Sequence, residues 1–173
     1  MATCYILRHA DKEVGDFYNP ELRIQDDPIS QKGKKQAQDL IPYFADKGIT
    51  GIYVSAYQRT LQTAAPLAGH LNLIPIVDER LNEINNGLFS SVPEEELPQR
   101  FPKEWQAYCK RRSDFRFPEG ETGEEAQNRI VDFLNEKKLP YVDLMDAHLK
   151  DYAQFKTDAK NVYGPLVVVI VKI

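Results

Sequence analysis

Near its N-terminus the sequence reads Tyr5-Ile6-Leu7-Arg8-His9-Ala10-Asp11-Lys12. The apolar run from Cys4 to Leu7 predicts a short buried strand that ends at an arginine–histidine pair. In open α/β sheets, chemistry gathers just beyond the carboxyl ends of the strands. Arg8 and His9 would therefore stand at that edge, a fixed cation beside the side chain that titrates nearest neutrality. A salt-bridged and solvated strand end would look the same, so the rest of the chain must decide.

The following residues alternate predicted strands with predicted helices. After a polar loop over residues 13–27, Ser30 offers an N-cap for an amphipathic helix. A strand over 52–55, a helix over 59–71 and an edge strand over 73–77 then follow. Such alternation indicates βαβ units. We expect one domain over residues 1–173, a three-layer α/β/α sandwich with a mostly parallel sheet.

The second half of the chain predicts an insertion and two further elements. Residues 93–117 suggest a small helical insertion, and Thr122 to Glu125 form a capping box that opens another helix. A helix is expected around residues 144–155. The most apolar run, Leu166 to Val171, suits a central parallel strand that is buried on both faces.

Composition excludes several classes of function. A content of 42% hydrophobic and 28% charged residues in a 173-residue chain is ordinary for one soluble domain, and a net charge of −4 argues against a nucleic-acid surface. The two cysteines imply no disulfide framework, and no zinc-ligand spacing appears, so we expect no metal or other cofactor. No signal peptide and no membrane span is readable. The expected compartment is a reduced cytoplasm, without a membrane partner.

Three predicted strand ends bring complementary side chains to one crevice. Arg8 and His9 follow the first strand, Arg59 follows the second, and Glu83 lies in the loop after the third. Guanidinium groups match phosphate oxygens, a neutral imidazole is a nucleophile, and a carboxyl group can protonate a leaving oxygen. The set suits phosphoryl transfer without a metal. Taken singly, Arg59 also fits a helix-surface cation and Glu83 a loop-solvating charge.

Five segments resemble one known family, in the order in which that family carries them. Residues 8–12 are similar to the Arg-His-Gly signature of the histidine phosphatase superfamily (the phosphoglycerate mutase-like proteins), in its Arg-His-Ala-Glu-Lys variant. The other four are the helix start at 27–37, the Ser-x-x-x-Arg-x-x-Gln-Thr-Ala segment at 55–64, the acid loop Leu81-Asn82-Glu83 with Gly87, and the Gly-Glu-Thr turn at 119–122. The resemblance runs from Cys4 to about Leu134.

This resemblance implies a role for each matching residue. His9 would become transiently phosphorylated, Arg8 and Arg59 would hold the phosphoryl group, and Glu83 would be the proton donor. The implied partner is a small phosphorylated substrate. Glu121 we interpret as a turn or cap residue.

Two departures from the family pattern qualify the expected activity. Gly15 stands where mutase members carry an asparagine, which makes phosphoglycerate mutase activity the less favoured one. The family's last strand is followed by Ser-His-Gly, whose histidine is a second phosphate ligand, whereas here Val171 leads to Lys172-Ile173. Neither His70 nor His148 follows a strand in that way.

The missing motif leaves three hypotheses open. In the first, the chain is a metal-independent phosphomonoesterase that acts through phospho-His9 and is impaired by the absent histidine. In the second, it is a module that binds a phosphorylated ligand. In the third, it is a truncated or frameshifted product with neither role. Because no helix follows Ile173, we expect part of one sheet face to be bare, which would favour self-association. We also expect the phosphate pocket to lack a wall where Val171 stands.

Overall fold

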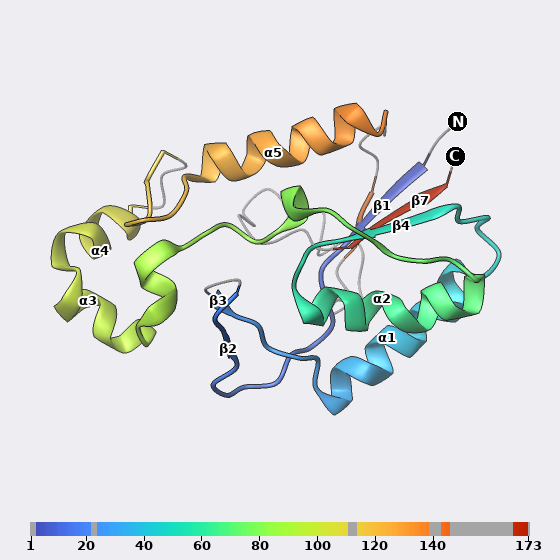
Figure 1. The fold of residues 1–173 in the computed structure, drawn as a ribbon, viewed down its shortest axis with the longest axis horizontal. Coiled ribbons are helices and arrows are strands. Elements are labelled where there is room, and N and C mark those ends of the chain that lie inside the picture. Colours follow the sequence, from blue (N-terminus) through green and yellow to red (C-terminus); the bar gives the residue numbers. More distant parts are fainter. Residues whose placement is uncertain (1–2, 22–23, 111–113, 139–142, 146–167, 173) are drawn as a thin grey trace.

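The computed structural model describes residues 3–21, 24–110, 114–138, 143–145 and 168–172, with the backbone alone described at residue 3 and beyond residue 138. Figure 1 shows the elements in chain order. The strands are β1 (Thr3–Leu7), β2 (Tyr18–Asn19), β3 (Ile24–Gln25), β4 (Gly51–Val54), β5 (Ile76–Val77), β6 (Asp143–Met145) and β7 (Val168–Lys172). The helices are α1 (Gln31–Phe44), α2 (Gln58–Leu71), α3 (Leu97–Arg100), α4 (Pro102–Tyr108) and α5 (Gly123–Glu136), with 3-10 turns η1 (Glu79–Leu81), η2 (Gly87–Ser91) and η3 (Glu94–Glu96).

Five strands form the central sheet in the order β5-β4-β7-β1-β6. β1 pairs in parallel with β6, and β4 pairs in parallel with β5. β7 lies between β1 and β4 and runs antiparallel to both. Four strands therefore point one way and one points the other, which confirms a mostly parallel sheet.

The last strand corrects two expectations from the sequence. β7 is central, as predicted, but it is not parallel to its neighbours. A run of apolar residues encodes burial on both faces and not direction, because either direction satisfies the backbone hydrogen bonds. Val168 pairs with Leu7 and Val54, whereas Val171 pairs with Cys4 and Gly51. Val171 thus lies at the opposite end of the strands from Arg8 and His9, and not beside them, where the missing wall was expected.

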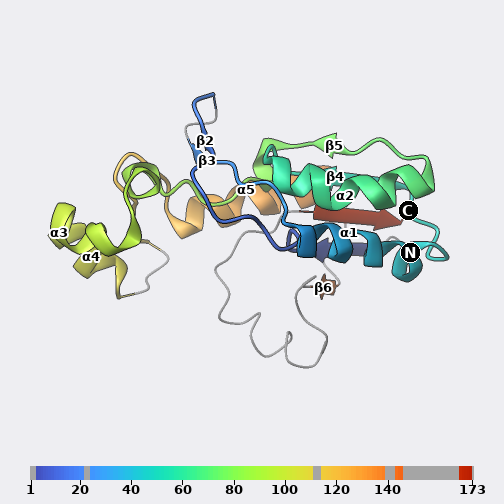
Figure 2. The ribbon, with the colours of Figure 1, turned by 90° about the horizontal axis from the view of Figure 1, so that it is seen from below.

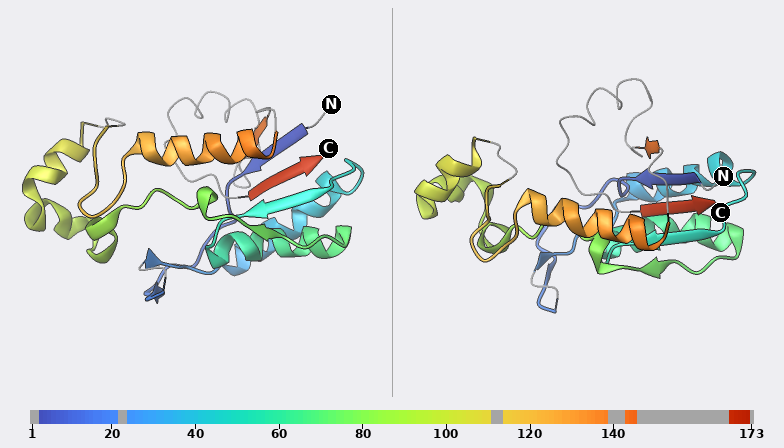
Figure 3. Two further views of the ribbon diagram at one scale, coloured as in Figure 1. Left: turned by 45° about the horizontal axis from the view of Figure 1, so that its top comes forward. Right: turned by 90° about the horizontal axis from the view of Figure 1, so that it is seen from above.

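The helices form the outer layers of the expected α/β/α arrangement. α1 and α2 cover one face of the sheet and α5 lies over the other (Figures 2 and 3). The alternation along β1 explains both layers, because successive side chains of a strand point to opposite faces. Leu7 packs in the cluster under α1 and α2, and Ile6 packs with Phe133 of α5.

Helix starts follow the predicted local signals. The Ser30 side chain accepts a hydrogen bond from the backbone N–H of Gly33 at the start of α1. Thr122 and Glu125 form the predicted capping box of α5. α1 continues through Pro42 and α2 through Pro66.

Other segments differ from the expectations in detail. The predicted loop over residues 13–27 contains a hairpin of β2 and β3. The insertion contains α3 and α4, which pack aromatic side chains around Phe89. Residues 143–145 form a strand and not the start of a helix, while residues 146–155 lie outside the described part. The expectation of a bare sheet face concerns residues outside the described part as well, so it stays a prediction. In the described ranges, no helix has the length and apolar character that crossing a membrane requires.

Candidate active site

The end of β1 presents Arg8 and His9 at the edge predicted for chemistry. Arg8 is exposed, whereas His9 is only 4% exposed. The Nδ1 atom of His9 lies 2.7 Å from the backbone oxygen of Ala10. Because a carbonyl oxygen only accepts, this bond places the proton of a neutral ring on Nδ1 and its lone pair on Nε2. In that tautomer, Nε2 is the ring nitrogen that carries the lone pair.

Two helices fix the backbone that follows His9. The N–H of Ala10 donates to Oγ1 of Thr63 in α2 at 2.9 Å, and the N–H of Asp11 donates to Oε1 of Gln36 in α1 at 2.8 Å. α1 approaches so closely that a Cβ at Gly33 would lie 2.1 Å from the backbone oxygen of Asp11. Glycine is the residue that permits this approach.

Arg59, in the first turn of α2, is a buried cation with an incomplete set of partners. It is 3% exposed, and its Nη2 donates to Oε2 of Glu83 at 2.6 Å. Its guanidinium carbon lies 4.1 Å from the centre of the Tyr57 ring. Among the described residues, its Nε has no hydrogen-bond partner. An unpaired buried donor is unfavourable, and an anionic oxygen would satisfy it.

Tyr57 stays a neutral phenol at physiological pH. Burial first, and then the negative charge of Glu83, raise the pKa of Tyr57 to about 12. Its ring covers the guanidinium of Arg59, so a cation–π contact and shielding from water act on the same group.

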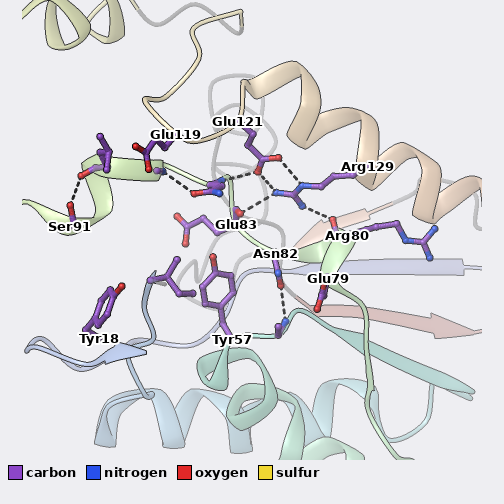
Figure 4. A pocket seen from close by; sticks show the side chains of 15 residues that line it. Tyr18, Tyr57, Glu79, Arg80, Asn82, Glu83, Ser91, Glu119, Glu121 and Arg129 are labelled. Atoms are coloured by element: carbon purple, nitrogen blue, oxygen red, sulfur yellow. Dashed lines mark hydrogen bonds and ion pairs between the residues drawn. The ribbon is translucent and has the colours of Figure 1, made fainter. Parts of the chain in front are cut away.

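Glu83, the ion-pair partner of the buried Arg59, also lines an open cavity of about 520 Å³. Tyr18 and Ile24 of the β2–β3 hairpin and Tyr57 line one side of the cavity, and residues of the acid loop and α5 line the other. Figure 4 shows Glu83 and Tyr57 facing the same space. A cavity of this volume has room for a small organic molecule.

The structure brings together two of the four predicted site residues by direct contact. Arg59 and Glu83 form an ion pair. His9 is linked to the helix of Arg59 only indirectly, because the N–H of the next residue, Ala10, donates to Thr63 of α2. No described contact joins the exposed Arg8 to them, and neither Arg8 nor His9 lines the cavity. In the part of the chain that the structure describes, no cluster of three or more His, Cys, Asp or Glu residues could hold a metal ion.

Sequence reasoning missed the residues that support Glu83. Asn82 accepts a hydrogen bond from the N–H of Ala56 at 2.8 Å, and Arg129 donates to the backbone of the acid loop. Glu121 is not the cap of α5, since Thr122 caps that helix, and pairs instead with Arg129. Helical spacing could not have revealed this pair, because Glu121 precedes the N-cap Thr122 and lies outside the helix that carries Arg129.

The comparison with protein families decides the identity of the fold. Residues 4–140 match the model of the histidine phosphatase superfamily (branch 1). The chain belongs to the histidine phosphatase superfamily. The segments that carry the match include the end of β1, the start of α2 and the acid loop, the elements that position His9, Arg59 and Glu83.

Relatives of this superfamily member include phosphatases. Phosphoserine phosphatase 1 of Hydrogenobacter thermophilus is 32% identical over 139 residues, which cover 79% of this chain and 64% of that protein. The probable phosphoglycerate mutase GpmB of Escherichia coli is 31% identical over 133 residues, which cover 75% of this chain and 60% of that protein. The chain therefore spans less than two thirds of the length of these relatives.

Solved structures of the superfamily share the fold. The α-ribazole phosphatase of Shigella flexneri superposes with a TM-score of 0.66 at 19% identity, over 84% of this chain and 72% of that one. The mycobacterial glucosyl-3-phosphoglycerate phosphatase, solved with inorganic phosphate, superposes with a TM-score of 0.61 at 20% identity, over the same shares of the two chains. At these identities the likeness confirms the α/β architecture.

Proposed function

We propose that this chain is a metal-independent phosphomonoester hydrolase in which His9 carries the phosphoryl group from substrate to water. The observation that supports this most strongly is the surroundings of Arg59. A buried guanidinium that holds one carboxylate and keeps one N–H without a described partner is arranged to receive an anionic oxygen. The strand end that carries His9 is hydrogen-bonded to the same helix.

The first step transfers the phosphoryl group to His9. Nε2 of His9 attacks the phosphorus atom, the bond to the leaving oxygen breaks, and the carboxyl group of Glu83 gives that oxygen its proton. Arg8 and Arg59 stabilise the charge on the equatorial oxygens. The incoming phosphate replaces Glu83 as a partner of Arg59, and its negative charge favours the protonated carboxyl group.

The second step regenerates the enzyme. Water attacks the phosphorus of phospho-His9, the P–N bond breaks, and the carboxylate of Glu83 accepts the proton of the water. Inorganic phosphate leaves, and His9 again has its lone pair on Nε2.

We further propose that turnover is slow, because Lys172 and not the Ser-His of the family motif directly follows Val171. The chain has three histidines. His70 lies exposed in the last turn of α2, at the far end of that helix from Arg59, and His148, which comes three residues after the end of β6, lies outside the described residues. Loss of one donor to the developing negative charge lowers a rate by about 10²–10³-fold. A chain that retains phosphate affinity with no turnover would instead be a module that binds phosphorylated ligands.

A phosphate-release assay on the purified chain tests this function. The substrates are p-nitrophenyl phosphate, phenyl phosphate, O-phosphoserine and 3-phosphoglycerate. O-phosphoserine is included because the relative from Hydrogenobacter thermophilus is named a phosphoserine phosphatase. We expect slow release that EDTA leaves unchanged, that His9→Ala abolishes, and that His70→Ala, the matched exposed histidine, preserves. Loss of activity in EDTA with recovery on adding magnesium or zinc, or activity in His9→Ala, would contradict the proposal.

A further inference from the structure

We propose that Arg129 of α5 is a positioning residue that aligns Glu83 for proton transfer. It does so by holding the backbone of residues 79–87, which are the acid loop together with the η1 turn before it. The inference rests on the proposed function, since it concerns the proton that Glu83 gives to the leaving oxygen.

Arg129 holds the acid loop at two backbone carbonyls. Its Nη1 donates to the oxygen of Arg80 at 2.6 Å, and its Nη2 donates to the oxygen of Glu83 itself at 3.1 Å. A planar guanidinium fork fixes the distance between its two acceptors, which an ammonium group does not. The backbone of the proton donor is therefore held directly by α5.

Glu121 contacts both Arg129 and the backbone of Asn85, two residues after Glu83. Its carboxylate accepts from Nε and Nη2 of Arg129 at 3.2 and 2.7 Å, and it also accepts from the N–H of Asn85 at 2.8 Å. Its own N–H donates to the oxygen of Asn85 at 3.0 Å. The pair thus contacts the backbone of residues 80, 83 and 85, that is, before, at and after Glu83 in the chain. Figure 4 shows Glu121 and Arg129 beside Glu83.

The environment strengthens this pair. The side chains of Arg129 and Glu121 are 21% and 19% exposed, so salt screens them less than it screens surface charges. Between η1 and η2 the acid loop has no regular secondary structure of its own. Its position depends on such contacts, and a misplacement of about 1 Å at a reacting group can lower a rate about 10²-fold.

A positioning role and a purely stabilising role of Arg129 predict different effects on phosphorylation rates with different leaving groups. A phenolate or alkoxide of high pKa needs a proton from Glu83 as its bond to phosphorus breaks, whereas p-nitrophenolate leaves without one. A misaligned Glu83 should therefore lower the rate at which phenyl phosphate phosphorylates His9. It should leave the rate with p-nitrophenyl phosphate nearly unchanged. A merely destabilised chain would lose both rates equally.

The test is the single-turnover rate of phosphoenzyme formation in the full chain with both substrates. We expect Arg129→Met to lower the phenyl phosphate rate by about 10²-fold and the p-nitrophenyl phosphate rate less than about threefold, with Arg129→Lys in between and Glu83→Gln as the reference. The matched control is Arg116→Met, which removes an exposed arginine paired with Glu125 at the start of the same helix. It should leave both rates unchanged.

Four outcomes would overturn the proposal. Equal losses with both substrates, or the same pattern in Arg116→Met, would show that Arg129 only stabilises the fold. Should Arg129→Met fail to fold, Glu121→Gln must show the same dependence on the leaving group, because it keeps an acceptor for the N–H of Asn85 and removes the charge facing Arg129. A parent chain that forms no phosphoenzyme with either substrate would overturn the proposed function, and the positioning role with it.

Discussion

At the scale of single residues, Arg59 combines burial with an unfilled hydrogen-bonding capacity. Its guanidinium is covered by Tyr57, paired with Glu83 and left with one unpartnered Nε among the described residues. A lysine at this position would keep the charge but not the planar fork that can hold two oxygens of a phosphate.

Arg59→Lys should therefore weaken phosphate binding and slow phosphoenzyme formation together. The loss of a charge-assisted contact with a desolvated partner is on the order of 2–5 kcal/mol. A calorimetric phosphate titration and the phosphorylation rate measure the two effects. The control is Arg100→Lys, an exposed arginine paired with Glu96, which should change neither. Unchanged phosphate affinity in Arg59→Ala would reduce Arg59 to a structural residue.

Tyr57 should make the stability of the fold depend on alkaline pH. Its pKa is raised from 10.0 to about 12 in the folded chain, so its stabilising contribution is complete below about pH 10 and is lost as the pH rises toward 12. A shift of this size corresponds to about 2–3 kcal/mol. Urea unfolding of the parent and of Tyr57→Phe, at pH values from about 9 to about 11.5, isolates the effect from that of the buried Cys4 thiol. An identical decline in both chains would exclude Tyr57 as its source.

At the scale of elements, the approach of α1 to the segment after His9 couples a helix to the nucleophile. Gly33→Ala places a methyl group against the backbone oxygen of Asp11, so either α1 or the segment must move. We expect a loss of phosphoenzyme formation of about 10-fold or more, because small displacements of a reacting group are costly in rate. The matched control is Gly69→Ala in α2, where nothing lies within 4 Å.

The control should behave in the opposite way. Alanine in an exposed helix position is more favourable than glycine by about 0.5–1 kcal/mol, so Gly69→Ala should raise the free energy of unfolding and preserve phosphorylation. If Gly33→Ala matched it in both measurements, the close approach of α1 would have no bearing on His9.

The elements also show which parts of the fold a sequence can predict. Ser30 and the capping box at Thr122 are local signals, and both mark helix starts correctly. The direction of β7 was predicted wrongly, because an apolar run is compatible with either pairing. The strand at 143–145 was mistaken for a helix, since three residues are too few to show a period.

The site divides in a similar way. Arg8, His9, Arg59 and Glu83 follow predicted strand ends, where α/β topology brings residues together, so a sequence can nominate them. Arg129 contacts the acid loop from 46 residues further along the chain, and only the packing of α5 on the sheet establishes that contact. Tyr57 escaped notice because its role depends on the rotamer of Arg59 above its ring.

At the scale of the whole molecule, the candidate site is assembled from four segments around one edge of the sheet. The end of β1, the start of α2, the acid loop and the turn before α5 each supply side chains or backbone contacts to it. The proposed function thus depends on one step, the transfer of a phosphoryl group to His9 at that edge.

The most direct measurement is the site of that transfer. The chain is mixed with labelled phenyl phosphate, quenched in base within one turnover, digested and analysed for phosphate that is stable in base and lost in acid. We predict a single such phosphate on the peptide that carries His9, retained in His70→Ala and absent from His9→Ala. Label on any other residue, or label that persists in His9→Ala, would contradict the account.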